Sequence, residues 1–340
     1  MSSGTTVRRA LESAIGNDDS LLRGLVTDYF PWILTVGIYL IAGFFLPTLF
    51  EGDTIETVFI QSTAVTILAL GMAFTLIVAE IDLSIVSVLL FAPTAGILAV
   101  QHFGLPGILA LPLAIVVALI VGYINGIVIT KIGVPSLIQT LAAWWALQGA
   151  VLSLTQGRTL AAIPEFYQTL GVGSIGPVRN LIILTVIVVA LAWFYSVKTV
   201  SGRRLFLVGG DSDSASRMGI DAAKYRRQAF LISAVLAALG GIALISRVGV
   251  ISSGTGADLL MPAIAAPVIA GVSLFGGTGK IINVPAGALL VQLILTITRV
   301  AGISGYEFQL VQGLLVFVAV VLMELKRQNS LRTLVLGGDR

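Results

Sequence analysis

The sequence predicts an all-α integral membrane protein with about ten transmembrane helices and both termini in the cytoplasm. Its 340 residues are 57% hydrophobic and only 11% charged, whereas soluble domains carry about 25% charged residues. The mean hydropathy is +1.02, and the apolar residues gather in runs close to the roughly 20 residues that a helix needs to cross a bilayer. Because 16 of the 20 Lys and Arg residues then fall on one side, the positive-inside bias fixes the orientation.

The chain divides by this pattern into five segments. Residues 1–30 are polar and lack an apolar core followed by a cleavage site, so we do not expect a removable signal peptide. A long polar loop separates two groups of apolar runs. The expected segments are a cytoplasmic leader at 1–30, transmembrane helices 1–6 at 31–197, a cytoplasmic loop at 198–228, transmembrane helices 7–10 at 229–325 and a basic cytoplasmic tail at 326–340.

Each apolar run predicts one transmembrane helix. Only a short segment with two acids, Glu80 and Asp82, separates the second run from the third. These two helices are therefore joined by a tight turn or form one broken helix. The eighth run is short for a bilayer. The runs cover about 31–50, 57–79, 83–100, 107–130, 134–154, 180–197, 229–245, 259–274, 281–300 and 308–325.

The residue inventory excludes several kinds of site. The chain has no cysteine, so it has no disulfide, thiolate nucleophile or cysteine-bound metal. Its single histidine, His102, argues against most transition-metal sites. The cations lie in loops beside apolar runs, where membrane topology explains them better than nucleic acid does.

A glycine loop lies between the eighth and ninth runs. Residues 273–279 read Ser-Leu-Phe-Gly-Gly-Thr-Gly, but they lack the Gly-Lys-Ser/Thr ending and the βαβ context of a phosphate-binding loop. We expect a tight cytoplasmic turn in which Gly276, Gly277 and Gly279 supply positive φ. No nucleotide-binding motif occurs in the sequence, so ATP hydrolysis is expected on another polypeptide.

Polar residues within the apolar runs are candidates for a transport path or its gate. A carboxylate at the bilayer centre costs about 2.5–3.5 kcal/mol on insertion scales, so acids there face protein or water. Glu80, Asp82 and Ser84 form a polar turn. This turn either lines the path or is an interfacial turn in which Asp82 caps the third helix. We expect Asp82 to be structural rather than proton-carrying.

Two amides on the fourth and fifth runs complete the candidate set. Asn125 either lines a polar path or makes an interhelical hydrogen bond. Gln139, the second candidate, is nine residues from Gln148. That separation is about 900° around a helix, so the two side chains lie on opposite faces and only one can face a central path.

The loop at 198–228 is the longest polar interval between apolar runs. Its seven cations and three aspartates give a net charge of +4, which favours the cytoplasmic side. Asp211 or Ser212 can cap a helix of roughly two turns, which Gly219 would end. Ala215 and Met218 are three residues apart and are expected on one face. Such a helix suits contact with a soluble partner; the alternative is a solvated connector.

Four sequence blocks in register resemble the ribose/xylose-type permease subunits of ABC importers, in the branched-chain amino acid/ribose superfamily. The blocks include Glu-Ile-Asp-Leu-Ser at 80–84, Val-Pro-Ser-Leu-Ile-Gln-Thr-Leu at 134–141, the loop from Gly-Arg-Arg at 202–204 to Gly-Ile at 219–220, and the glycine loop. The sequence departs from the family at Glu80 and Val86, where Gly is usual, and at 283–285, where Asn-Val-Pro replaces Gly-Thr.

The resemblance implies a type II-like ABC importer permease, which is the membrane subunit of a transporter and not an enzyme. It would move a monosaccharide or related polyol across the bacterial inner membrane by alternating access. The expected partners are a second permease subunit in a homo- or heterodimer, a cytoplasmic tandem ATPase, a periplasmic sugar-binding protein and the lipid bilayer, with no nucleic acid. No cofactor is expected in this chain, since ATP and Mg²⁺ would bind the ATPase.

The resemblance also places the short helix of the cytoplasmic loop in a cleft of the ATPase. Its small and apolar residues, above all Ala215, would lie against that partner. Ala215→Glu would then weaken the contact without affecting folding. The residues expected to couple the chain to the ATPase are Asp211, Ser212, Ala215, Ser216, Arg217, Met218, Gly219 and Ile220.

The sequence leaves three alternative functions. A branched-chain amino acid ABC permease belongs to the same superfamily, but the Ile-Asp-Leu-Ser segment favours sugars. An ion-coupled secondary transporter needs a titratable relay in the membrane, for which only Glu80 and Asp82 are available. A membrane scaffold without transport activity is disfavoured by the resemblance.

Overall fold

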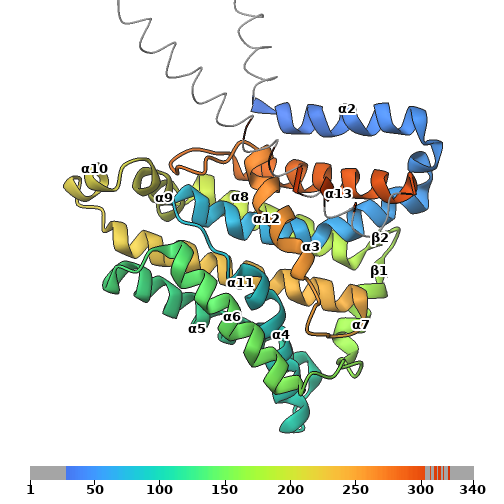
Figure 1. Ribbon diagram of the computed structural model, residues 1–340, viewed down its shortest axis with the longest axis horizontal. Coiled ribbons are helices and arrows are strands. Elements are labelled where there is room, and N and C mark those ends of the chain that lie inside the picture. The colour runs from blue at the N-terminus through green and yellow to red at the C-terminus, as the bar shows by residue number, and fades with distance from the viewer. Residues whose placement is uncertain are drawn as a thin grey trace, which may run out of the picture.

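The computed structural model describes residues 28–302 and seven further positions between 307 and 321. This part of the chain is helical apart from one small hairpin and its loops, as the sequence predicts (Figure 1). Seven of its helical segments are long and apolar enough to cross a membrane, and two shorter ones, Phe30–Phe45 and Ala257–Ile269, are also apolar. The tail, nearly all of the leader and most of the tenth expected helix lie outside the described residues.

The elements follow the chain in a simple order. The first half contains α2 (Phe30–Phe45), η1 (Pro47–Phe50), α3 (Gly52–Ile77), α4 (Ile85–His102), η2 (Gly107–Leu109), α5 (Ala110–Ile127), η3 (Val128–Ile132), α6 (Ser136–Thr155) and α7 (Glu165–Val172). The second half contains β1 (Ser174–Ile175), β2 (Val178–Arg179), α8 (Asn180–Lys198), α9 (Val200–Gly210), α10 (Ser212–Arg217), α11 (Ala222–Val248), η4 (Ala257–Leu259), α12 (Leu260–Ile269), η5 (Ile281–Asn283) and α13 (Val284–Val300). β1 and β2 pair antiparallel, with Ser174 opposite Arg179.

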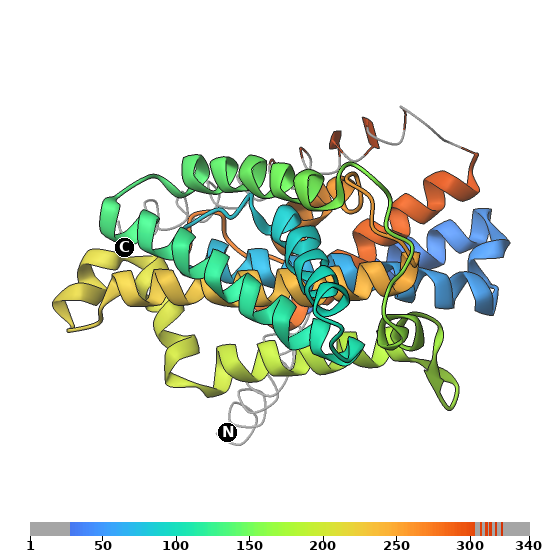
Figure 2. The ribbon, with the colours of Figure 1, turned by 90° about the horizontal axis from the view of Figure 1, so that it is seen from below.

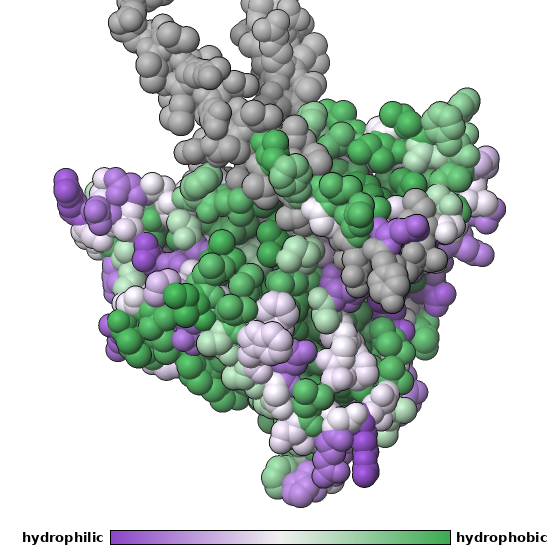
Figure 3. Space-filling view, viewed as in Figure 1, coloured by the Kyte–Doolittle hydropathy of each residue, from purple (hydrophilic) through white to green (hydrophobic). Residues whose placement is uncertain are grey.

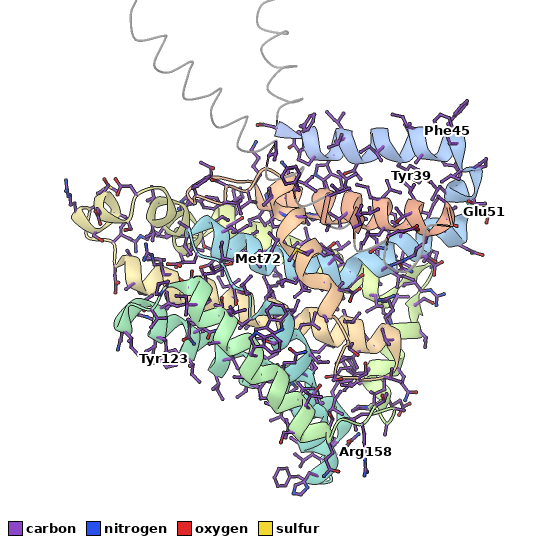
Figure 4. The ribbon with its side chains drawn as sticks, viewed as in Figure 1. Tyr39, Phe45, Glu51, Met72, Tyr123 and Arg158 are labelled. Atoms are coloured by element: carbon purple, nitrogen blue, oxygen red, sulfur yellow. The ribbon has the colours of Figure 1, made fainter. Side chains whose placement is uncertain are left out.

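Helices α3 and α11 form the centre of the fold, and their neighbours bury most of both. α11 packs along α3, α5 and α4, while α12 and α13 lie on α3. Figure 2 shows α6 and α8 on opposite sides of this centre. Figure 4 locates Met72 of α3, which is fully buried, and Tyr123 of α5 and Phe45 of α2, which are exposed.

The two ends of the helices differ in character. α9, α10 and the turn between α3 and α4 lie at one end of the molecule, whereas α7 and the β1–β2 hairpin lie at the other (Figure 1). Hydrophilic side chains gather around α10, and apolar side chains cover much of the face beside it (Figure 3). Since the positively charged loop at 198–228 forms the α10 end, we expect that end to face the cytoplasm by the positive-inside bias.

Each of the first nine expected spans overlaps one helix, with ends that differ by up to seven residues, as at the start of α11. Two features of the loops were not expected. The central loop begins with α9, whose start is capped by Thr199, since Thr199 Oγ1 accepts from Gly202 N at 2.9 Å. The segment between α6 and α8 contains α7 and the hairpin. α12 is only 10 residues long, so the short eighth span is confirmed.

The glycine loop packs on α9 and on the end of α3, backbone against backbone. Gly276, Gly277 and Gly279 have φ of 86°, 71° and 146°, which confirms the expected tight turn. Gly277 N donates to Ile77 O at 2.9 Å. A Cβ added to Gly209 of α9 would lie 1.6 Å from the same Ile77 O. This contact therefore joins α9 directly to the end of α3.

Helix α2 lies at the edge of the fold and packs mainly on α13. Thr35 Oγ1 lies 3.0 Å from Ala286 O, a contact between residues 251 positions apart. Lys280 Nζ pairs with Asp28 Oδ1 at 2.7 Å, and Asn283 Nδ2 donates to Asp28 O at 2.8 Å. The first described helix is thus fixed by residues near the end of the described chain.

Candidate functional site

Helix α3 ends in a polar turn (residues 78–84) that leads into α4. Ala79 has φ of 61°, a left-handed conformation that is uncommon outside glycine. Ile81 N donates to Ser136 Oγ at 3.4 Å, and Leu83 N donates to Thr140 Oγ1 at 3.1 Å. Because these two backbone N–H groups have no helical partner, side chains of α6 satisfy them.

Asp82 is the centre of a hydrogen-bonded network inside the protein. Its Oδ1 accepts from Ser84 N at 3.0 Å and from Ser84 Oγ at 2.5 Å, and its Oδ2 accepts from Ser233 Oγ at 2.7 Å. Asp82 is 2% exposed, and a buried carboxylate is tolerated when donors satisfy its oxygens. Since Ser233 belongs to α11, the carboxylate ties the polar turn to the central helix.

The network continues to both candidate amides. Asn125 Nδ2 donates to Ser84 Oγ at 3.0 Å, and Gln139 Nε2 donates to Asn125 Oδ1 at 3.1 Å. The structure therefore brings Asp82, Ser84, Asn125 and Gln139 together and joins the polar turn, α5, α6 and α11 through them. Asp82, Ser84 and Asn125 are each at most 2% exposed, so their polar groups bind one another instead of facing an open path.

The structure changes two details of the sequence interpretation. No side chain caps α4, which begins at Ile85, so Asp82 binds the residue before the helix instead of capping it. Glu80 lies outside the network: its Oε1 is 3.4 Å from Arg226 Nη1 of α11.

The sequence patterns did not reveal two members of the network, Ser233 and Thr140. The spacing of Ser136 and Thr140, four residues apart on one face of α6, is a signal that was available. A serine within the 27-residue α11 gives no comparable signal.

Helix α10 has a well-formed N-cap. Asp211 Oδ1 accepts from Asp213 N and Ser214 N at 3.0 Å each, and its Oδ2 accepts from Ser214 Oγ at 2.6 Å. The hydrogen bonds from the Ser214 side chain and backbone hold the pKa of Asp211 below its ordinary value of 3.8. After Arg217 the chain turns through Gly219 at φ of 77°. The expected cap and the expected end of this helix are both confirmed.

The expected partner surface of α10 is wrong at Ala215. This residue is 0% exposed and belongs to the core of its own chain, where α10 meets α9 and α11. Met218 is 64% exposed; the helix ends at Arg217, so Met218 lies beyond the helix and does not share the face of Ala215. Ile220 is partly buried against the core. The exposed side chains of this segment are Asp211, Asp213, Ser214, Ser216, Arg217 and Met218.

Helix α6 is the most exposed and the least apolar of the seven candidate spans in the described chain. Its mean hydropathy is 1.3, and only 11% of it is buried. The other two poorly buried spans, α8 and the segment Gly107–Ile132, have mean hydropathies of 2.3 and 2.6. Trp145 of α6 is 67% exposed, and Gln148 lines a small cavity against α4 and residues 253–257.

Fold and site together define a class of protein. A bundle of helices long and apolar enough to span a membrane holds a buried polar network, and a capped helix lies at the positively charged end, as in a multi-pass membrane permease. The comparison with known proteins gives the particular family. Residues 54–320 match the family described as "Branched-chain amino acid transport system / permease component", and the chain belongs to this family.

Named relatives cover most of the chain. The ribose import permease protein of Haemophilus influenzae is 30% identical over 280 residues, which are 81% of this chain and 86% of that protein. Autoinducer 2 import system permease proteins of Yersinia pestis and Yersinia enterocolitica are 31% and 32% identical over 276 residues, 80% of this chain and 77% and 75% of theirs. The chain is therefore an ABC importer permease of the ribose type, not an enzyme, and a multi-pass protein of the bacterial inner membrane, as predicted.

Proposed function

We propose that this chain is the membrane subunit of an ATP-driven importer for a monosaccharide or a related polyol. Relatives that match over most of their length are named for the import of ribose and of autoinducer 2. The cavity beside α6 measures only about 20 Å³ and mixes hydroxyl, amide and indole groups with aliphatic side chains, so the solute class rests on the named relatives. A periplasmic sugar-binding protein would deliver the solute, and ATP and Mg²⁺ would bind a cytoplasmic tandem ATPase.

The observation that carries the proposal is the exposure of α6. A helix face in contact with lipid is strongly apolar, as in α8, because hydrocarbon cannot satisfy polar groups. α6 is less apolar and yet is only 11% buried within its own chain. We therefore assign it a second permease subunit, identical or closely related, so that two α6 helices flank a central path. Gln139 is bound to Asn125 and Gln148 lies against α4, so the exposed side chains of α6, such as Trp145, face that path.

The exposed surface of α10 is the proposed contact with the ATPase. A displacement of α10 by the ATPase would move α9. Gly209 of α9 packs so closely on Ile77 O that the end of α3 would move with it. From the end of α3 the displacement reaches the polar turn, which is connected to α6 directly by Thr140 and, through Asn125, by Gln139. In this proposal, the polar turn and α6 move together, and their movement opens the path to one side of the membrane at a time.

Paired cysteine variants test the position of α6. The chain has no native cysteine, so Trp145→Cys on α6 and Leu191→Cys on α8 each introduce a single thiol. Both side chains are exposed, at 67% and 63%. Oxidation in native membranes should produce a disulfide-linked dimer from Trp145→Cys and none from Leu191→Cys. The reverse result would place α8 at the subunit interface and remove the argument for the path.

Reconstituted uptake tests the transport reaction itself. The permease, its ATPase and its binding protein in proteoliposomes should accumulate a sugar only when ATP is enclosed and the binding protein is present. Uptake that continues without the ATPase would favour the ion-coupled alternative.

A second candidate solute follows from the family description, which names branched-chain amino acids. Titration of the purified binding protein with leucine and with D-ribose separates the two solute classes. Binding of leucine alone would replace the sugar in this proposal and leave the assembly unchanged.

A further inference from the structure

A polar cavity lies at the cytoplasmic end, where the polar turn meets α11 and the start of α6. Its volume is about 360 Å³, within the range of small-molecule sites. Glu80 and Arg226 line it together with three hydroxyl-bearing residues, Thr130, Ser136 and Ser212. Ser212 is the first residue of α10, so one wall of this cytoplasmic cavity belongs to the proposed coupling helix.

The two charged residues of the cytoplasmic cavity are only loosely paired. Arg226 Nη1 and Glu80 Oε1 are 3.4 Å apart, whereas a tight charge-assisted hydrogen bond spans about 2.7–2.9 Å. Arg226 Nε is buried and has no hydrogen-bond partner among the described residues. A buried donor without a partner requires an explanation, and a bound molecule is one.

The hydrogen-bonding chemistry of Glu80 and Arg226 indicates which class of ligand the cavity would bind. A carboxylate only accepts hydrogen bonds and a guanidinium only donates them, whereas neighbouring hydroxyls of a sugar do both. An anion would be attracted by Arg226 but repelled by Glu80, and a cation would meet the opposite conflict. A neutral polyol satisfies both residues without adding charge.

We propose that the cytoplasmic cavity binds a neutral polyol between Glu80 and Arg226, as the last site of the transported solute before its release. The site rests on the proposed function for the direction of transport, but its binding chemistry does not depend on that function. Because Ser212 forms part of the wall, movement of α10 changes the site and links release to the ATPase.

Protection of a single cysteine tests the binding. Ala223 lines the cavity and is partly exposed, so Ala223→Cys in nanodisc-embedded permease can be labelled with a polar maleimide. D-ribose, D-xylose and D-glucose are the probes, and the bound sugar should slow labelling about threefold at twice its Kd. Ser214→Cys, which is exposed on α10 and does not line the cavity, should label at the same rate with and without sugar.

Three substitutions in the Ala223→Cys background identify the binding groups. Glu80→Gln and Arg226→Gln should each abolish the protection, while Lys224→Gln, an exposed neighbour on α11, should retain it. A melting temperature close to that of the parent protein confirms that each variant is folded. Arg226 is more exposed than Glu80, so Arg226→Gln should fold even if Glu80→Gln does not. The Arg226→Gln variant alone then tests the site.

The outcomes separate this proposal from the proposed function. Protection that disappears in both pair variants and persists in Lys224→Gln supports the site. No protection by any of the three sugars, or protection that survives both substitutions, overturns it and leaves Glu80 and Arg226 as a structural pair. ATP-driven sugar uptake without protection removes the site alone, whereas protection without ATP-dependent uptake removes the importer function alone.

Discussion

Replacing Asp82 by asparagine tests whether the buried carboxylate holds the polar turn or carries a proton. Asp82 accepts three hydrogen bonds, two from Ser84 and one from Ser233. In Asp82→Asn the remaining oxygen keeps both bonds from Ser84, and the Ser233 hydroxyl must turn to accept from the new amide. Bonds to a charged group become neutral ones, so the free energy of unfolding should fall by roughly 1–2 kcal/mol. Asp82→Leu leaves three donors unpaired, at about 1–3 kcal/mol each.

The assay compares stability with ATP-driven uptake across the neutral pH range. Asp82→Asn should show a small decrease in melting temperature, near-normal uptake and an unchanged pH profile. Ser233→Ala is the matched control, since it removes one bond to the carboxylate without changing the acid. Asp82→Leu should fold poorly. A folded Asp82→Asn protein that loses uptake or shifts its pH profile would show that the carboxylate titrates during transport, and the structural role would be refuted.

Further predictions concern the cytoplasmic end. Gly209→Ala should cost about 1–3 kcal/mol of stability, because its Cβ would lie 1.6 Å from Ile77 O; a melting temperature equal to the parent's would contradict this. Ala215→Glu should destabilise the fold, since Ala215 is buried, while Met218→Glu should keep the melting temperature and weaken co-purification of the ATPase. The lowered pKa of Asp211 means that its contribution to the α10 cap is present above about pH 4 and is lost as pH falls through the lower folded pKa. The anisotropy of a fluorophore on α10 should report this loss, and Asp211→Asn should remove the pH dependence.

Much of the candidate site could be predicted from the sequence because polar groups inside a membrane protein need partners. The sequence predicts a polar turn with Asp82 and Ser84 and, independently, polar roles for Asn125 and Gln139, and the structure shows all four in one network. Helix caps are local, so Asp211 was predictable as well. In both cases the physical constraint acts on residue type, which the sequence contains.

The remaining errors concern burial, which depends on contacts between distant segments. An alanine suits an exposed helix as well as a close contact, and nothing around Ala215 indicates that α9 and α11 cover it. α9 was expected to be loop because Arg203 and Arg204 make it polar, although both residues are good helix formers. The pairing of Glu80 with Arg226 joins residues 146 positions apart, and residue type alone does not indicate it.

The docking of α2 on α13 sets the order in which the chain can complete its fold. The bond partners Thr35 and Ala286 are separated by 251 residues, which a ribosome needs roughly 10–50 s to add at about 5–20 residues per second. During that interval the Thr35 hydroxyl can donate to Pro31 O, 2.7 Å away. Helix α2 therefore has no unpaired hydroxyl in the bilayer before α13 is made. A nascent chain that stops before α13 leaves α2 undocked, so this contact forms only after residue 286 has been added.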